Sequence, residues 1–192
     1  MRQADVKRQT KETDINLFID LDGKGNVDID TGIGFFDHML TALAVHAGFD
    51  LTISCKGDLG VDSHHTIEDV GIVLGQAFLK AIGDCAKIAR YGSALIPMDE
   101  SLAQASIDIG GRAYLVFNAS FLNGLIGSMD SQMIEEFFRA FTVNAQLTLH
   151  LNLLYGKNDH HKAEALFKAA AYAIKTAILQ TSAPTLSTKG MV

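Results

Sequence analysis

A short motif occurs twice in this chain of 192 residues, and its spacing divides the chain into two halves. The sequence His-His-x-x-Glu begins at His64 and returns at His160, which is 96 positions later (160 − 64) and half the chain length. Repetition at a fixed interval is typical of a chain built from copies of one folding unit. We therefore expect a single domain over residues 1–192, made of two repeats of approximately 1–90 and 91–192.

Each copy of the motif is a candidate metal site. Residues three and four positions apart share one face of a helix, so the glutamate of each copy lies beside both of its histidines. Imidazole binds zinc, copper, iron, nickel and manganese, and an added carboxylate favours manganese and iron. Paired histidines at a helix start can also be ordinary polar residues, but their repetition favours ligands.

Histidines outside the motif extend the set of candidate ligands. His38 and His150 have no counterpart in the other half, and chemistry is expected to arise where repeated halves diverge. His46 is given no role. The eight candidate metal ligands, enough for two ions, are His38, His64, His65, Glu68, His150, His160, His161 and Glu164.

Hydrophobic periodicity and turn residues predict an α+β fold, with the order ββαβα in each half and helices layered against sheet. The polar residues 2–11 carry no predicted element, and residues 118–130 are expected to be irregular. Strands 15–21 and 26–30 are expected to pair as a hairpin. The remaining first-half elements are a helix over 36–47, a strand over 49–56 and a helix over 64–86. In the second half we expect strands over 102–109 and 113–117, a helix over 131–146, a strand over 147–155 and a helix over 159–179.

Charge and hydropathy narrow the class of protein. The chain has 16 Lys and Arg against 22 Asp and Glu, a net charge of −6, and no basic run that would bind nucleic acid. No apolar run reaches the roughly 20 residues needed to cross a bilayer, and the start of the chain does not resemble a signal peptide. Cys55 and Cys85 do not form a disulfide framework. We expect a cytoplasmic protein with no membrane and no nucleic-acid partner.

Several longer motifs, in order along nearly the whole chain, resemble the imidazoleglycerol-phosphate dehydratase family of histidine biosynthesis. They are Gly32-Ile33-Gly34-Phe35-Phe36-Asp37-His38-Met39-Leu40, Asp62-Ser63-His64-His65-Thr66-Ile67-Glu68-Asp69, Leu149-His150-Leu151, Asp159-His160-His161-Lys162-Ala163-Glu164 and Ser187-Thr188-Lys189-Gly190.

The resemblance implies a lyase that dehydrates imidazole glycerol phosphate to imidazole acetol phosphate. It implies two manganese ions per active site and a metal-bound imidazolate intermediate, since an electron sink is needed before the side-chain hydroxyl can leave. The implied fold is a pair of ββαβα halves of the ribosomal protein S5 domain 2-like type. The implied assembly is a shell of twenty-four identical chains with active sites between subunits.

The resemblance also implies roles for residues outside the metal set. Glu12, in Thr10-Lys11-Glu12-Thr13, is the first candidate for substrate contact and proton transfer, and Glu68 or Glu164 could serve instead. Because the chain is acidic, it can hold a phosphate only where cationic side chains lie at the binding site. The predicted substrate-binding residues are Glu12, His38, Arg90, Arg112, Ser187 and Lys189.

Two other functions use the same ligands. A metal-storage or structural-metal protein would explain the repeated motif, although structural sites usually close with four protein ligands and have no use for phosphate-binding cations. A metallohydrolase would use the ligands to activate water and would release inorganic phosphate. The products formed from imidazole glycerol phosphate distinguish these alternatives from a dehydratase.

Overall fold

The two halves of the chain repeat one order of strands and helices in the computed structural model, which describes residues 1–186. The first half contains β1 (Gln3–Gln9), β2 (Thr13–Asp20), β3 (Val27–Asp30), α1 (Gly34–Ala47), β4 (Asp50–Gly57) and α2 (His64–Ile82). The second half contains β5 (Tyr91–Met98), β6 (Ser101–Asp108), β7 (Tyr114–Asn118), the short hairpin β8 (Leu125–Ile126) and β9 (Met129–Asp130), then α3 (Met133–Ala145), β10 (Thr148–Tyr155) and α4 (Asp159–Ala177).

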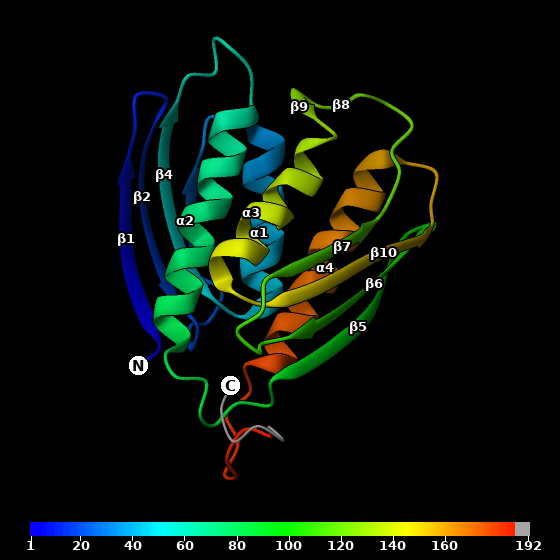
Figure 1. Ribbon diagram of the computed structural model, residues 1–192. Coiled ribbons are helices and arrows are strands. Elements are labelled where there is room, and N and C mark those ends of the chain that lie inside the picture. The colour runs from blue at the N-terminus through cyan, green and yellow to red at the C-terminus, as the bar shows by residue number, and fades with distance from the viewer. Residues whose placement is uncertain (187–192) are drawn as a thin grey trace.

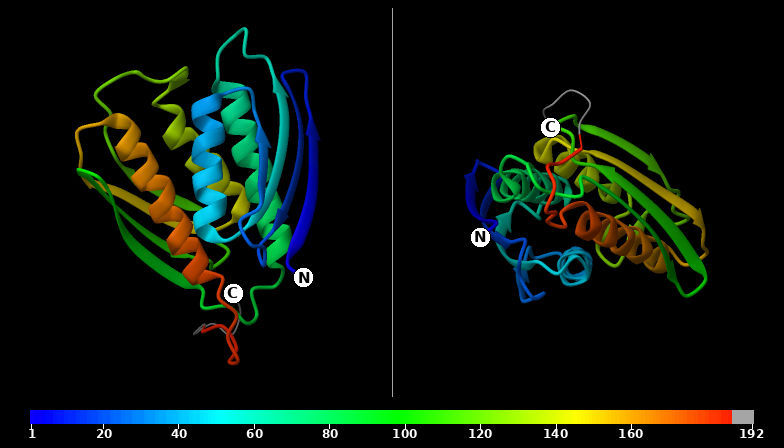
Figure 2. Two further views of the ribbon diagram at one scale, coloured as in Figure 1. Left: turned by 180° about the vertical axis from the view of Figure 1, so that it is seen from behind. Right: turned by 90° about the horizontal axis from the view of Figure 1, so that it is seen from below.

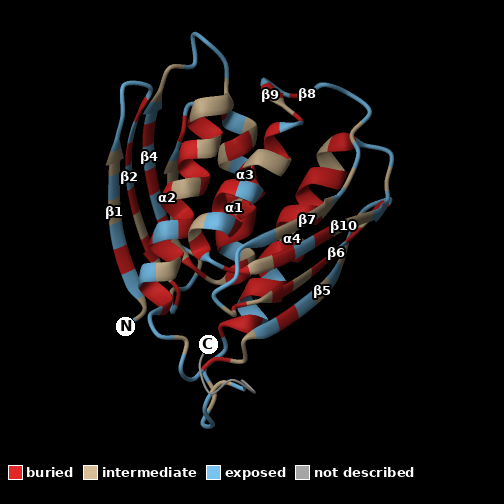
Figure 3. Cartoon of the chain, in the orientation of Figure 1, coloured by how far each residue is buried: buried red, intermediate tan, exposed pale blue. Residues whose placement is uncertain are grey.

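The helices lie between two four-stranded sheets whose strand orders correspond, β1-β2-β4-β3 and β5-β6-β10-β7 (Figure 1). α1 and α2 cover the first sheet, while α3 and α4 cover the second. The helix layers also pack on each other, α2 on α3 and α1 on α4, as the view from below in Figure 2 shows. Side chains along the strands alternate between buried and exposed, because successive residues face opposite sides of a sheet (Figure 3).

The closest helix contact joins the two halves and depends on glycine. A Cβ atom on Gly71 would lie 2.9 Å from the backbone oxygen of Phe137, and one on Gly75 would lie 2.6 Å from that of Phe141. Both distances are too short for a side chain, so these glycines let α2 and α3 approach closely. Phe78, Phe137 and Phe141 then fill a core that belongs to both halves.

The predicted α+β class is confirmed. Among the described residues, the first half has one strand more than the predicted ββαβα order and the second half has three more, because the hairpin β8–β9 forms within residues 118–130, which were expected to be irregular. β1 lies within the polar segment that carried no predicted element, and β5 is its counterpart. β1 is an edge strand paired only with β2, and it has the charged, weakly alternating sequence that edge strands use to avoid pairing with other chains. Its hydrophobic periodicity is therefore too weak to detect.

The predicted hairpin between residues 15–21 and 26–30 is wrong. β3 pairs in parallel with β4, and the antiparallel neighbours of β2 are β1 and β4. The connecting turn is held at the start of β4, because the carboxylate of Asp50 accepts hydrogen bonds from the backbone N–H groups of Lys24 and Asn26 at 2.8 and 2.9 Å. β7 likewise pairs in parallel with β10.

All four long helices begin at the same end of the molecule (Figures 1 and 2). The parallel pairs α1–α4 and α2–α3 therefore bring the first turns of one half beside the first turns of the other. Both His-His-x-x-Glu motifs lie in these first turns. Within residues 1–186, no helix combines the length and the apolar content required to cross a membrane.

Candidate metal centre and active site

Three predicted ligands from two different helices converge at the start of α4. Nε2 of His160 lies 3.3 Å from Oε2 of Glu164, and Nε2 of His38, on α1, lies 3.6 Å from the same oxygen. The three donor atoms lie within 4.8 Å of one another. His160 and Glu164 meet because they are four residues apart on one helix, and His38 reaches them because α1 packs beside α4.

The other oxygen of Glu164 is fixed by a lysine. Lys168, one turn further along α4, places its Nζ 2.6 Å from Oε1 of Glu164. Burial by itself raises the pKa of the Glu164 carboxyl, but the hydrogen bond and charge of Lys168 outweigh it, and the pKa lies below its ordinary value. Glu164 is thus an ionised carboxylate with Oε2 directed at the two histidines.

The first motif forms a similar but more open group at the start of α2. Nε2 of His64 lies 3.6 Å from Oε2 of Glu68, whose side chain is 45% exposed against 10% for Glu164. His64 also lines an open pocket of about 300 Å³ together with Glu136 on α3. The more exposed Glu68 is the freer of the two motif glutamates.

Glu136 is a functional candidate that the sequence prediction missed. α1 and α3 both end at a left-handed residue, Gly48 and Gln146, 98 positions apart (146 − 48). The same offset places Glu136 where α1 has His38 (38 + 98). Aligning the helix ends, instead of searching for histidines alone, would have found this carboxylate.

The second histidine of each motif faces a different set of carboxylates. Nδ1 of His65 lies 3.0 Å from Oδ2 of Asp58, and its Nε2 lies 3.8 Å from Glu12. The hydrogen bond to Asp58 raises the pKa of His65 above its ordinary value.

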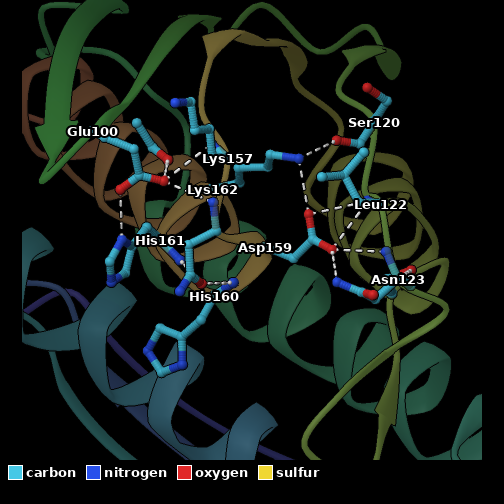
Figure 4. Close-up of polar contacts among 12 residues, drawn as sticks. Glu100, Ser120, Leu122, Asn123, Lys157, Asp159, His160, His161 and Lys162 are labelled. Carbon is cyan, nitrogen blue, oxygen red and sulfur yellow. Dashed lines mark hydrogen bonds and ion pairs between the residues drawn. The ribbon is translucent and has the colours of Figure 1, made fainter.

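His161 repeats this arrangement (Figure 4). Its Nδ1 lies 2.7 Å from Oε2 of Glu100, and its Nε2 lies 3.5 Å from Asp99. Glu100 also accepts hydrogen bonds from the backbone N–H groups of Asn158 and Lys157. These amides, and then His161, hold the pKa of Glu100 well below its ordinary value, and Glu100 in turn raises that of His161.

Within one chain, His150 lies apart from the other predicted ligands, so its assignment as a metal ligand stays a prediction that requires a neighbouring subunit. It lies on β10 between Leu149 and Leu151, which are buried under the helices, so its exposed side chain projects from the opposite face of the sheet. Strand alternation is the signal that separates it from the cluster.

A buried ion pair fixes the start of α4 (Figure 4). Asp159 and Lys162 are 5% and 3% exposed, and Oδ1 of Asp159 lies 2.8 Å from Nζ of Lys162. Asp159 also accepts hydrogen bonds from the backbone N–H groups of Leu122 and Asn123, which attaches the loop between β7 and β8 to the helix. Burial raises the pKa of Asp159, but Lys162 and these amides outweigh it and lower the pKa to about 2.

The predicted phosphate-binding residues Arg90 and Arg112 lie at the end of the molecule opposite the metal ligands. The backbone N–H of Arg90 donates to the carbonyl of Ala177, the last residue of α4, and the carbonyl of Arg112 accepts from Thr148 at the start of β10. Asp108 pairs with Arg90 at 2.7 Å, and that hydrogen bond raises the Arg90 pKa. Ser187 and Lys189 lie outside the described residues.

The donor atoms fit a divalent ion of the manganese type. Two imidazole nitrogens and a carboxylate oxygen match the ligand preference of manganese and iron. The separations of 3.3 and 3.6 Å are close to the roughly 3 Å between neighbouring ligands of one small divalent ion. The first motif offers an imidazole and a carboxylate in His64 and Glu68, 3.6 Å apart, and His64 shares its pocket with Glu136.

Comparison with known proteins identifies the family of this chain. Residues 31–174 match the family described as imidazoleglycerol-phosphate dehydratase. The chain belongs to the imidazoleglycerol-phosphate dehydratase family. The matched range includes both histidine motifs, His38, Arg90 and Arg112, while Glu12 and the last residues lie outside it. The family predicted from the sequence motifs is therefore confirmed.

Relatives in this family match over the full length of the chain. Imidazoleglycerol-phosphate dehydratase of Streptococcus sanguinis is 55% identical and covers 100% of both chains, and that of Methanosarcina mazei is 55% identical over 99% of both. The solved dehydratase structure from Staphylococcus aureus is 43% identical with a TM-score of 0.85, covering 93% of this chain and 99% of that one. The Pyrococcus furiosus enzyme, solved in complex with (S)-C348, is 34% identical with a TM-score of 0.85, covering 97% and 100%.

The buried pair at the start of α4 gives a stability prediction. Replacing Asp159 with Asn leaves the Lys162 charge buried without its partner, so we expect a loss of about 3 kcal/mol in the free energy of unfolding at neutral pH. The double variant Asp159→Asn, Lys162→Met should recover much of this loss. Denaturant unfolding measures each value, and Glu135→Gln, which breaks the exposed pair with Arg139, should cost less than about 1 kcal/mol.

The pH dependence of this effect has a defined sign. The pKa of Asp159 falls from an ordinary 3.8 to about 2 on folding, so its contribution is fully present above pH 3.8 and is lost as the pH falls toward 2. The gap between the parent and Asp159→Asn should close over that interval. A gap that is equally large at both ends would show that the carboxylate charge is not its cause.

Proposed function

We propose that this chain catalyses the dehydration of imidazole glycerol phosphate to imidazole acetol phosphate in histidine biosynthesis. The observation that carries the proposal is the convergence of His38, His160 and Glu164, in a member of a family named for this reaction. We further propose that the enzyme is cytoplasmic and uses two manganese ions per active site.

The proposed reaction removes a hydroxyl from the carbon attached to the imidazole ring and a proton from the neighbouring side-chain carbon. The resulting enol becomes the ketone. Manganese held by the two motifs would supply the positive charge that stabilises negative charge on the ring nitrogens. His38, His160 and Glu164 would hold one ion, and His64 and Glu68 would hold the other.

Glu12 is the proposed proton-transfer group. It lies in the turn between β1 and β2, where its backbone N–H donates to Thr10 Oγ1 and its carbonyl accepts from the N–H of Asp58. Its backbone is thus fixed, while its carboxylate is 52% exposed and 3.8 Å from His65. An exposed carboxylate beside a ligand histidine can reach both a bound substrate and solvent. Glu164 is less suited because Lys168 already holds one of its oxygens.

The distance between the proposed ligands and the proposed phosphate anchors supports active sites shared between subunits. His160 is the second residue of α4 and Arg90 is bonded to the last, which corresponds to about 25 Å along the helix axis. A substrate with one ring and a three-carbon chain cannot span that length. We therefore propose that Arg90 and Arg112 of one subunit, with Ser187 and Lys189, bind the phosphate at the metal ligands of another.

The second histidines support the same arrangement. The ring centroids of His64 and His65 are 6.2 Å apart with planes at 75°, and those of His160 and His161 are 6.1 Å apart at 82°. The second ring of each pair has its own carboxylate partner, Asp58 for His65 and Glu100 for His161, outside the motif. Facing a neighbouring subunit, His65 and His161 could complete ligand sets there. A closed homo-oligomer, which we propose to be a 24-mer, would place every subunit in the same environment.

The reaction product tests the proposed function. With manganese and imidazole glycerol phosphate, the protein should form the ketone imidazole acetol phosphate and release no inorganic phosphate. Chelation of the metal should abolish the reaction, and manganese should restore it. Phosphate release would instead support a hydrolase, and absence of either product would support metal storage.

The role of Glu12 is tested by Glu12→Gln. We expect unchanged manganese content and assembly, with turnover lowered by about a hundredfold because a proton-transfer group is lost. Steady-state kinetics and metal analysis of the same preparation measure both. Asp28→Asn, an exposed carboxylate on β3, is the matched control and should keep parental turnover. Near-parental turnover in Glu12→Gln would remove Glu12 from this role.

Shared active sites predict complementation between two inactive variants. Arg112→Ala and His160→Ala should each be inactive alone, whereas particles assembled from an equal mixture should regain about a quarter of the parental activity. The fraction follows because half of the subunits on each side of an interface carry the intact residue. Sedimentation velocity confirms that the mixed particles form. Mixed particles with no activity would show that one subunit supplies both residues.

A further inference from the structure

The second histidine of each motif, His65 or His161, has a carboxylate at its Nδ1 atom. The two carboxylates come from different positions in the two halves. Nδ1 of His65 is bonded to Asp58, in the loop that follows β4, while Nδ1 of His161 is bonded to Glu100, in the turn between β5 and β6. β4 corresponds to β10, and Gly57 at the end of β4 corresponds to Gly156 after β10. The residue that corresponds to Asp58 is therefore Lys157.

Lys157 cannot provide the carboxylate, and the second half obtains it elsewhere. The backbone N–H of Lys157 instead donates to Glu100 at 3.0 Å, and that of Asn158 donates at 2.7 Å, so the turn carrying Glu100 is attached to the loop before α4. A contact present in both halves but built from non-equivalent positions is not explained by repetition of the sequence alone. It indicates that the contact itself is needed at both histidines.

The distances show what this contact does to each ring. The carboxylates at Nδ1 lie within hydrogen-bond range, at 3.0 Å for Asp58 and 2.7 Å for Glu100. The nearest carboxylates to Nε2 lie beyond it, at 3.8 Å for Glu12 and 3.5 Å for Asp99. Nδ1 is thus the nitrogen that donates a proton, and the lone pair of Nε2 is directed outward.

We propose that Asp58 and Glu100 are positioning residues that keep His65 and His161 in the tautomer and orientation that offers Nε2 to a metal ion. The inference rests on the proposed manganese sites. A carboxylate at the second nitrogen of a ligand histidine fixes its tautomer and makes it a stronger donor. The first histidines, His64 and His160, have no such Nδ1 partner among the described residues. They are oriented instead within their own helices, beside Glu68 and Glu164.

Manganese alone is the probe for the first test, so that its outcome does not depend on the reaction assigned above. Titration calorimetry on metal-stripped protein should show that Asp58→Ala and Glu100→Ala each weaken manganese binding by about ten- to a hundredfold. Asp58→Asn and Glu100→Gln, which keep an oxygen acceptor, should lie between these variants and the parent. At saturating manganese, all four should regain most of their turnover.

Asp50→Ala is the matched control, because Asp50 accepts two backbone N–H hydrogen bonds as Glu100 does but contacts no histidine. It should bind manganese as the parent does. Equal losses in the control and the test variants would indicate general damage to the fold and would overturn the proposal. Unchanged affinity in both alanine variants would also overturn it.

The tautomers of the two rings in the unmodified protein provide a second test. Solid-state NMR of sedimented, metal-free protein labelled with ¹⁵N-histidine, at about pH 9 where the rings are neutral, distinguishes the two tautomers. His65→Gln and His161→Gln assign the signals. We expect both residues to carry the proton on Nδ1, and a proton on Nε2 in either ring would contradict the role assigned to its carboxylate.

Discussion

The candidate site depends on the packing of helices from one half of the chain against helices from the other. Within residues 1–186, neither half alone brings together three ligands, because His38 belongs to the first half and His160 and Glu164 belong to the second. The parallel contacts α1–α4 and α2–α3 align the first turns of all four helices at one end. The glycines that allow α2 and α3 to touch therefore contribute to the chemistry as well as to the core.

The two halves share a topology but differ in the charged groups around their motif glutamates, Glu164 and Glu68. Around Glu164 the protein is closed and ionic, with Lys168 on one oxygen and the buried Asp159–Lys162 pair beneath the first turn. Around Glu68 it is open, and Ile72, four residues later, offers no charge. The cluster at the second motif is therefore the more rigid of the two. Two metal sites with the same plan would thus differ in mobility and in charge.

Much of the fold and of the candidate site was predictable from the sequence, and the errors in the prediction have physical causes. The motif period suggested two halves, and the two sheets have corresponding strand orders. Helical spacing correctly paired His160 with Glu164 and His64 with Glu68. Edge strand β1 was missed because polar residues conceal its periodicity. The hairpin was wrong because hydrogen bonds from Asp50 hold the turn before β3 to β4, and local alternation carries no information about such long-range pairing. Strand alternation places His150 on the face of the sheet away from the helices, so as a metal ligand it stays a prediction that needs a neighbouring subunit. Glu136 was overlooked because the search considered histidines first.

The central claim, that residues from both halves of the chain hold manganese at the helix starts, is tested most directly by anomalous diffraction at the manganese absorption edge. Crystals grown with manganese should show one anomalous peak within coordination distance of Nε2 of His38, Nε2 of His160 and Oε2 of Glu164. A second peak should lie beside His64 and Glu68. Manganese bound away from both motifs, or held by one half of the chain without His38, would contradict the account.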